Sequence, residues 1–404
     1  MKILALGRSA LGACASVALL AACSSGGSQL PLSPSPQGLS RQQSHAETAY
    51  NILHEFGVSP DDGKNPSADL INVKGTLYGT TVGGGSHIYG TVFKITKTGQ
   101  ETVLHSFGMS GDGANPTARL LNVNGTLYGT TSGGGKGGYY SAGTVFSLTP
   151  SGTEKVLHSF TSGSSYYAPN GGLHPNAGLI DVDGTLYGTT QQGGNELSCG
   201  TVFSITTSDN FKVLHKFCAT NYDGANPAAA LLNVDGTLYG TTSGGGTGGH
   251  GTVFSITTAG KYRMLYGFGT HDNGNDPLAA LINVNGTLYG TTSGSGRGGT
   301  VFSITTDGTE KTIFSFNGSD GSQPLAGLVD VKGVLYGTTA MGGAYNRGTV
   351  FSVTTSGEET VVHSFHAGGG ENPKAGLLDV GGILYGTTYG IVKNNHGNVF
   401  SLTP

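Results

Sequence analysis

The motif Leu-Tyr-Gly-Thr-Thr occurs seven times, and this repetition constrains the fold more than any other feature of the chain. Neighbouring copies are about 50 residues apart, a period typical of propellers and other repeat architectures. Each copy has a proline twelve residues before its tyrosine and an alanine two residues after that proline. The tyrosines are Tyr78, Tyr128, Tyr187, Tyr239, Tyr289, Tyr336 and Tyr385. In such proteins each unit packs only on its neighbours, so 404 residues can form one domain.

Each copy contains four segments with the pattern of a β-strand, which we call strands a to d. In the first copy they span 68–73, 76–81, 90–96 and 103–107. Strands a and b are joined by turns such as Asn124-Gly125, whose residues favour a type I′ hairpin. The invariant proline opens strand a, where its missing N–H does least harm. Four short strands per unit at this period predict a β-propeller blade, with the small alanine near the axis.

The two ends of the repeat region complement each other. The region begins with a single strand d at 52–56 and ends with a single strand c at 398–402. Joining these two strands in one sheet would complete the last blade and leave no open sheet edge. The sequence therefore predicts an all-β fold, a single seven-bladed β-propeller over residues 47–404, with its ring closed by the N-terminal strand.

Three motifs recur together in these copies: Gly-x-Leu-Tyr-Gly-Thr-Thr, Gly-Thr-Val-Phe and an Asp-Gly turn before the proline. In this respect residues 50–404 resemble the GloVer tandem-repeat proteins, a family of bacterial surface proteins. The resemblance implies an extracellular location. It implies no activity, because none is assigned to the repeat. The kelch propellers are similar in repeat length only, since this chain has no tryptophan.

The first 46 residues lack the repeat and have the features of an export signal. A basic and then apolar stretch ends in Leu-Ala-Ala-Cys at Cys23, which resembles the lipobox of bacterial lipoproteins. The resemblance implies a signal peptide at 1–22, acylation of Cys23 and, because Ser24 follows, the outer membrane. Residues 23–46 have the composition of a flexible tether. We expect contact with the membrane through this anchor only; the alternative is secretion without a lipid.

Charge and spacing argue against several kinds of chemistry. Removal of the signal peptide leaves 18 basic and 24 acidic residues with no basic run, so we expect no nucleic-acid partner. Gly-x-Gly-x-x-Gly occurs at 133–138, 244–249 and 294–299, but a strand follows it instead of the helix that a nucleotide site needs. No catalytic arrangement is identifiable from spacing, and we predict no cofactor.

Two sets of repeated polar residues are of types that bind metals, but their positions indicate structural roles. Histidines occupy one equivalent position on strand d, where other copies have Tyr266 or Phe314, so we interpret them as packing residues. Asp-Gly pairs before the prolines supply too few carboxylates for a calcium loop, so we interpret them as turns. We therefore predict no metal site. The residues are His54, His105, His158, His215 and His363, and Asp62, Asp112, Asp223 and Asp320.

Two cysteines lie within the repeats, Cys199 on strand c and Cys218 after strand d of the same blade. If Thr206 pairs with Phe211 across the c–d hairpin, paired residue numbers sum to 417, and so do 199 and 218. The two cysteines would then lie opposite each other. In an oxidising compartment this predicts a disulfide; the alternative is two buried thiols.

Function should reside where the copies differ. Loop lengths vary only in the b–c and d–a connections, which share one face of a propeller, and both are longest around blade two. These loops carry Tyr139, Tyr140, Tyr166 and Tyr167, which we predict to contact a ligand, either a glycan or an envelope or extracellular protein. The sequence favours a monomeric surface recognition or scaffold module. The alternatives are a propeller enzyme acting on an extracellular polysaccharide and a purely structural envelope protein.

Overall fold

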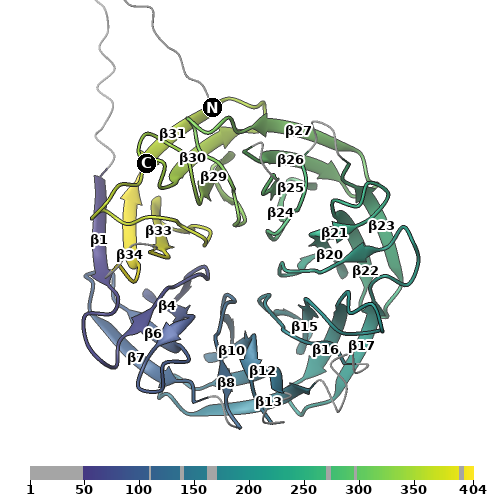
Figure 1. The fold of residues 1–404 in the computed structure, drawn as a ribbon, viewed down its shortest axis with the longest axis horizontal. Coiled ribbons are helices and arrows are strands. Elements are labelled where there is room, and N and C mark those ends of the chain that lie inside the picture. Colours follow the sequence, from purple (N-terminus) through teal and green to yellow (C-terminus); the bar gives the residue numbers. More distant parts are fainter. Residues whose placement is uncertain are drawn as a thin grey trace, which may run out of the picture. The chain divides into compact units, whose positions relative to one another are not determined.

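The computed structural model describes residues 49–404 except 109–110, 137–140, 162–170, 270–273, 295–297 and 391–394. These residues belong to one compact unit, residues 47–404. They form seven four-stranded antiparallel sheets arranged around an axis, as Figure 1 shows. The prediction of a seven-bladed β-propeller is confirmed. The described part of the chain contains no apolar helix of membrane-spanning length.

The blades follow one another in chain order, each with strands a to d. Blade one contains β3 (Ile71–Val73), β4 (Thr76–Thr81), β6 (Thr91–Ile95) and β7 (Glu101–Ser106). Blade two contains β9 (Leu121–Val123), β10 (Thr126–Thr131), β12 (Ser141–Leu148) and β13 (Glu154–Thr161). Blade three contains β14 (Ile180–Val182), β15 (Thr185–Thr190), β16 (Thr201–Thr206) and β17 (Phe211–Lys216). Blade four contains β19 (Leu232–Val234), β20 (Thr237–Thr242), β22 (Thr252–Thr257) and β23 (Tyr262–Gly267).

The remaining blades repeat this arrangement up to the closure of the ring. Blade five contains β24 (Ile282–Val284), β25 (Thr287–Thr292), β26 (Thr300–Thr305) and β27 (Glu310–Ser315). Blade six contains β28 (Val329–Val331), β29 (Val334–Thr339), β30 (Thr349–Thr354) and β31 (Glu359–Ser364). Blade seven contains β32 (Leu378–Val380), β33 (Ile383–Thr388), β34 (Asn398–Thr403) and, as its outermost strand, β1 (Ala49–Glu55). Closure by the N-terminal strand is therefore confirmed.

The hydrophobic core lies between the blades. At each interface the phenylalanine after strand d of one blade packs edge-on against the phenylalanine of strand c in the next, with ring centroids 4.9 to 5.5 Å apart. Phe107 and Phe146 form one such pair. Because every blade supplies one phenylalanine to each side, the core continues around the ring. This accounts for the fixed interval of fourteen residues between the two phenylalanines of a repeat, as between Phe93 and Phe107.

Strand a is shorter than the sequence predicted, three residues instead of six. In the first half of the predicted strand, the invariant alanine forms a hydrogen bond with another blade instead of with strand b. The first threonine of Leu-Tyr-Gly-Thr-Thr donates its hydroxyl to the carbonyl of the invariant alanine in the next blade, as Thr130 does to Ala177 at 2.9 Å. Six such bonds of 2.8 to 3.3 Å lie among the described residues. The alanine is thus both small and a hydrogen-bond acceptor between blades.

The two sets of variable loops share one face, as predicted. Three small two-stranded sheets pair a d–a loop with the next b–c loop. They are β2 (Gly63–Lys64) with β5 (Gly83–Gly84), β8 (Gly113–Ala114) with β11 (Gly133–Gly134), and β18 (Gly224–Ala225) with β21 (Gly244–Gly245). We call this side the loop face. The a–b turns have positive φ at both central residues, as at Asn124 and Gly125 (52° and 89°), in agreement with the predicted type I′ turn.

Candidate functional site: the channel mouth and the blade interfaces

A hollow of about 720 Å³ opens where the blades converge, and we call it the channel mouth. Its size is within the usual range for small-ligand sites. Every blade contributes the residue directly after its invariant proline. These residues are Ser67, Thr117, Asn176, Ala228, Leu278, Leu325 and Lys374. Ser132, His174 and Gln191 from the adjoining loops complete the lining. This ring of residues was not predicted from the sequence, although a variable position between an invariant proline and an invariant alanine is a signal for it.

The channel mouth is chemically two-sided. Blades seven, one, two and three supply an ammonium, two hydroxyls and an amide in succession, whereas blades four, five and six supply only Ala228, Leu278 and Leu325. The polar side chains are therefore contiguous, and so are the apolar ones. A ligand that fits this surface carries hydrogen-bonding groups on one side and apolar surface on the other.

Contacts on the polar side hold its groups in place. Lys374 Nζ lies 3.5 Å from the centroid of the Tyr389 ring, and burial lowers the pKa of its ammonium. Asn176 donates from its side-chain nitrogen to Gln191 Oε1 at 2.6 Å. His174 Nδ1 is 2.7 Å from the carbonyl oxygen of Ser132; a carbonyl only accepts, so Nδ1 is the donor. These groups are preorganised for binding.

The described residues that line the channel mouth supply no paired carboxylates. None of its described lining residues is an Asp or Glu. Another carboxylate on a channel-side loop, that of Asp69, accepts a hydrogen bond from Gly376 N at 2.6 Å and so joins blade one to blade seven. The described lining residues offer hydrogen-bonding groups, one positive charge and apolar contact.

The repeated histidines do pack as predicted, but they also meet acidic groups that the sequence did not reveal. His105 lies edge-on against Phe107, with ring centroids 4.7 Å apart. Its Nε2 is 3.1 Å from Asp112 Oδ2, and Asp112 also accepts from Gly108 N and Gly113 N. Burial acts to raise the pKa of Asp112, but these hydrogen bonds together hold it below its ordinary value. The turn role of the aspartate is therefore confirmed, with the histidine as an additional partner.

A glutamate from the next blade joins His105 and Asp112 to form a cluster of three side chains. Glu154, the first residue of β13, lies beside His105 and Asp112, and the three ligand atoms lie within 4.8 Å of one another. Glu101 completes an equivalent cluster with His54 and Asp62. Burial raises the pKa of Glu101 and of Glu154 to about 7. In the sequence, the signal for such a cluster is a glutamate at the start of strand d, one repeat after the histidine.

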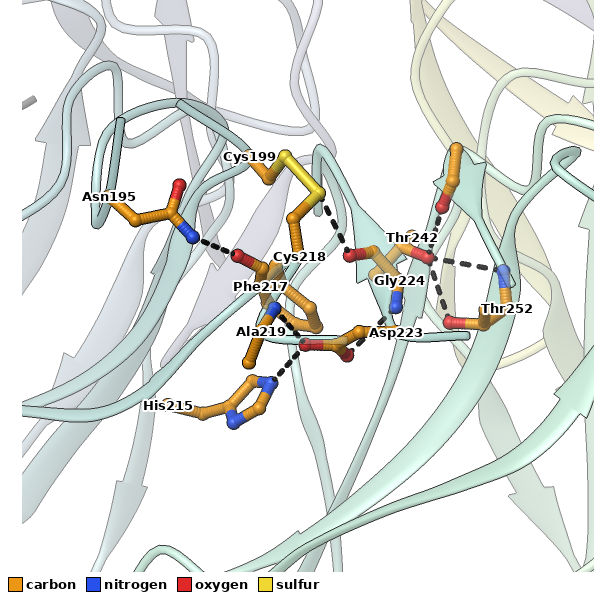
Figure 2. A network of polar contacts seen from close by, with 11 residues as sticks. Asn195, Cys199, His215, Phe217, Cys218, Ala219, Asp223, Gly224, Thr242 and Thr252 are labelled. Carbon is orange, nitrogen blue, oxygen red and sulfur yellow. Dashed lines mark hydrogen bonds and ion pairs between the residues drawn. A yellow bond between two sulfur atoms is a disulfide. The ribbon is translucent and has the colours of Figure 1, made fainter. Parts of the chain in front are cut away.

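Other blade interfaces replace the glutamate by an aromatic ring. His158 stacks on Phe211, His215 on Tyr262 and His363 on Tyr50, with centroids 4.0 to 4.2 Å apart. Figure 2 shows this region of blade three, where His215 Nε2 lies 3.0 Å from Asp223 Oδ2, close to the disulfide. The predicted bond between Cys199 and Cys218 is present, with 5.9 Å between the Cα atoms.

The strand register from which this disulfide was predicted is wrong near the hairpin turn. Phe211 pairs with Ile205 instead of Thr206. A β-bulge at Leu214 then shifts the register, so that Val202 pairs with His215 and paired numbers sum to 417 from there on. The cysteines lie beyond the bulge, which is why the expected pair forms.

Several predicted site residues lie outside the described residues. These are the four tyrosines Tyr139, Tyr140, Tyr166 and Tyr167, together with Cys23. Of the loop that carries two of the tyrosines, the structure describes the end, and there His174 and Asn176 line the channel mouth.

Comparison with solved structures finds many β-propellers at low identity. The chain is 13% identical to a protein of unknown function from Bacteroides thetaiotaomicron, with a TM-score of 0.47, covering 88% of this chain and 76% of the other. It is 15% identical to TolB from Acinetobacter baumannii (TM-score 0.37, 66% of this chain, 58% of TolB). It is 12% identical to Trypanosoma rangeli sialidase (TM-score 0.45, 88% and 59%). The chain thus spans less than two thirds of the length of TolB and of the sialidase. No curated protein matches it.

The comparison with protein families gives a specific result. The model of the Gloeobacter/Verrucomicrobia repeat matches residues 37–178 and 174–400, which together include all seven prolines at the channel mouth. The chain therefore belongs to the Gloeobacter/Verrucomicrobia repeat family.

Proposed function

We propose that this protein is a cell-envelope lipoprotein, anchored in the outer membrane through acylated Cys23, that recognises a ligand at the channel mouth. One observation carries the binding proposal. Within each repeat, the residue between the invariant proline and the invariant alanine lines the hollow, and the seven blades have six different residue types there. If this residue only supported the ring, seven equivalent surroundings would favour similar residues. Its variation instead produces one two-sided surface.

The lining indicates the class of ligand. Lys374 supplies a positive charge, and Ser67, Thr117 and Asn176 supply hydrogen-bonding groups on the same side. Leu278 and Leu325 supply apolar contact on the other side. A glycan unit that carries a carboxylate and hydroxyls on one side and C–H groups on the other matches this distribution. The four tyrosines at 139, 140, 166 and 167 remain a prediction for the outer part of the same site.

Binding should be measured on the purified chain with Cys23→Ser, against neutral and acidic glycans and envelope polymers. We expect an acidic glycan to bind and Lys374→Ala to weaken it at least tenfold, because a charge-assisted contact is lost. Leu278→Ser should also weaken binding, through the apolar side. The matched control is Lys97→Ala, which removes the same charge from an exposed c–d turn at the opposite end of the strands.

Three results would contradict the binding proposal. Equal binding by Lys374→Ala, Leu278→Ser and the control would move the site away from the channel mouth. Loss of binding only when all four tyrosines are changed to Ala would place it on the blade-two loops alone. Binding of an envelope protein but of no glycan would overturn the assigned ligand class. The anchor is tested separately, by mass spectrometry of the N-terminal peptide of the mature protein, where an unmodified Cys23 would exclude the lipoprotein assignment.

A further inference from the structure

The interface between blade seven and blade one brings three ligand-type side chains together. His54 lies on the closing strand β1, Asp62 on the loop that follows it, and Glu101 at the start of β7. One ligand atom from each of these residues lies within 4.8 Å of the other two. The side chain of Asp62 is 4% exposed and that of His54 is 16% exposed. The cluster is therefore enclosed, and each of the three residues presents one ligand atom to the other two.

These atoms lack the partners that buried polar atoms normally have. His54 Nε2, Asp62 Oδ1 and Glu101 Oε1 are buried, and none of these atoms has a hydrogen bond. His54 Nε2 and Asp62 Oδ1 are 3.5 Å apart, an ion-pair distance, while the other oxygen of Asp62 accepts from Gly57 N and Val58 N. A buried polar atom without a partner destabilises the folded state. Three such atoms that converge on one point are what a metal ion would satisfy.

We propose that a divalent transition-metal ion of the Zn²⁺ type binds to His54, Asp62 and Glu101 and fastens the closing strand to blade one. One imidazole and two carboxylates are the donors that zinc accepts, whereas Ca²⁺ and Mg²⁺ prefer oxygen ligands alone. Ligand atoms around tetrahedral zinc are roughly 3.4 Å apart, so movements of about 1 Å bring the three into place. A fourth position remains for water.

The other interfaces provide natural comparisons within the same molecule. His215 and Asp223 have Tyr262 where the glutamate would be, and Asp320 and Glu359 have Phe314 in place of the histidine. Each of these sets lacks one ligand. His105, Asp112 and Glu154 form a complete set, but His105 Nε2 already bonds to Asp112 at 3.1 Å, so this set should bind metal more weakly. The complete sets flank blade one, next to the place where the ring closes.

The test is a calorimetric titration of the chelator-treated, dialysed protein with ZnCl₂, repeated with CoCl₂ to follow the visible absorption of the bound ion. We expect one site of micromolar affinity or tighter, a melting temperature that rises by several degrees with Zn²⁺, and no comparable effect of CaCl₂. Glu101→Gln should weaken the tight site at least tenfold and abolish the thermal shift. Glu359→Gln, the same change at an interface without a histidine, should leave both unchanged.

His54→Phe is the second variant, because Phe314 shows that this fold accepts phenylalanine at the equivalent position. It should lose the tight site as Glu101→Gln does, even if the glutamine variant folds poorly. The proposal is overturned if the unaltered protein binds no Zn²⁺ below 100 µM, taking ~10⁻⁴ M as the limit of specific affinity here. It is equally overturned if both variants bind as the unaltered protein does, or if Glu359→Gln loses the site too.

Discussion

Cys199 and Cys218 are bonded across a strand pair whose register changes by one residue before it reaches them. The bond encloses the hairpin of β16 and β17, including the bulge at Leu214. It also lies beside the loop that holds Asp223 against His215, as Figure 2 shows. The disulfide therefore fixes the loop-face end of blade three.

Changing both cysteines to alanine should lower the free energy of unfolding by about 1 kcal/mol. The chain-entropy model allows up to ~3 kcal/mol for a loop of this length, but the hairpin already holds the two strands together. Urea denaturation measures the loss. A reducing agent should destabilise the unaltered protein by the same amount and leave the double variant unaffected. Free thiols in the non-reduced mature protein would contradict the pairing.

The closing strand should be essential to the stability of the ring. Tyr50 on β1 stacks on His363 and packs against Phe400, and its hydroxyl donates to the carbonyl of Gly369. Tyr50→Ala should therefore cost about 2 to 3 kcal/mol, because a large, partly buried aromatic ring is lost. Deleting residues 47–57 should cost still more, because β34 becomes an open edge. Both effects are measured by thermal unfolding. Rapid amide exchange at 52–56 in the intact protein would contradict them.

The glycine of Leu-Tyr-Gly-Thr-Thr should tolerate no side chain. A Cβ on Gly79 would lie 2.6 Å from Cζ of Phe93, the phenylalanine that pairs with it, and 2.8 Å from Leu70 Cδ2. Gly79→Ala should destabilise the protein by about 1 to 3 kcal/mol through overpacking. Gly83→Ala is the matched control in the same blade, since its nearest neighbour would be 3.9 Å away. The control should change stability by less than ~0.5 kcal/mol in the same urea experiment.

Glu359 should make stability depend on pH. Burial, with the nearby charge of Asp320, raises the pKa of this glutamate from its ordinary 4.5 to about 7. Between these pH values the folded protein holds a proton that the unfolded chain has lost, so stability falls as pH rises from about 4.5 to 7 and stays lower above. Because the residue is partly exposed, the effect should be on the order of 1 kcal/mol.

The measurement is thermal unfolding of Glu359→Gln at pH 5 and pH 8. We expect the variant to match the unaltered protein at pH 5 and to be more stable at pH 8, because glutamine carries no charge to bury. Part of the pH dependence should persist in the variant, because the pKa values of Glu101 and Glu154 are also raised. Destabilisation by the variant at pH 8 would show that the ionised form of Glu359 has a favourable role.

The sequence was sufficient to predict the features that recur in every blade. The strands, their number, the closing strand and the loop face all follow from spacing, because equivalent residues in seven copies have the same neighbours. It did not reveal the short strand a, since the bond from Thr130 to Ala177 joins different blades. It also did not reveal the His54, Asp62 and Glu101 cluster, whose members come from two blades and recur in full only once more among the described residues. Properties of a single interface are not encoded in the repeat.

The pairing of Ala49 with Thr403 makes the starting point of the chain arbitrary. A short linker between them would turn blade seven into a blade like the others, and the ring could then be cut at any c–d turn to give a circular permutant of the same shape. The same relationship creates a hazard. A closing strand that leaves its own β34 can fill the vacant edge of a second molecule, so the protein has an inherent route to strand-swapped dimers at high concentration.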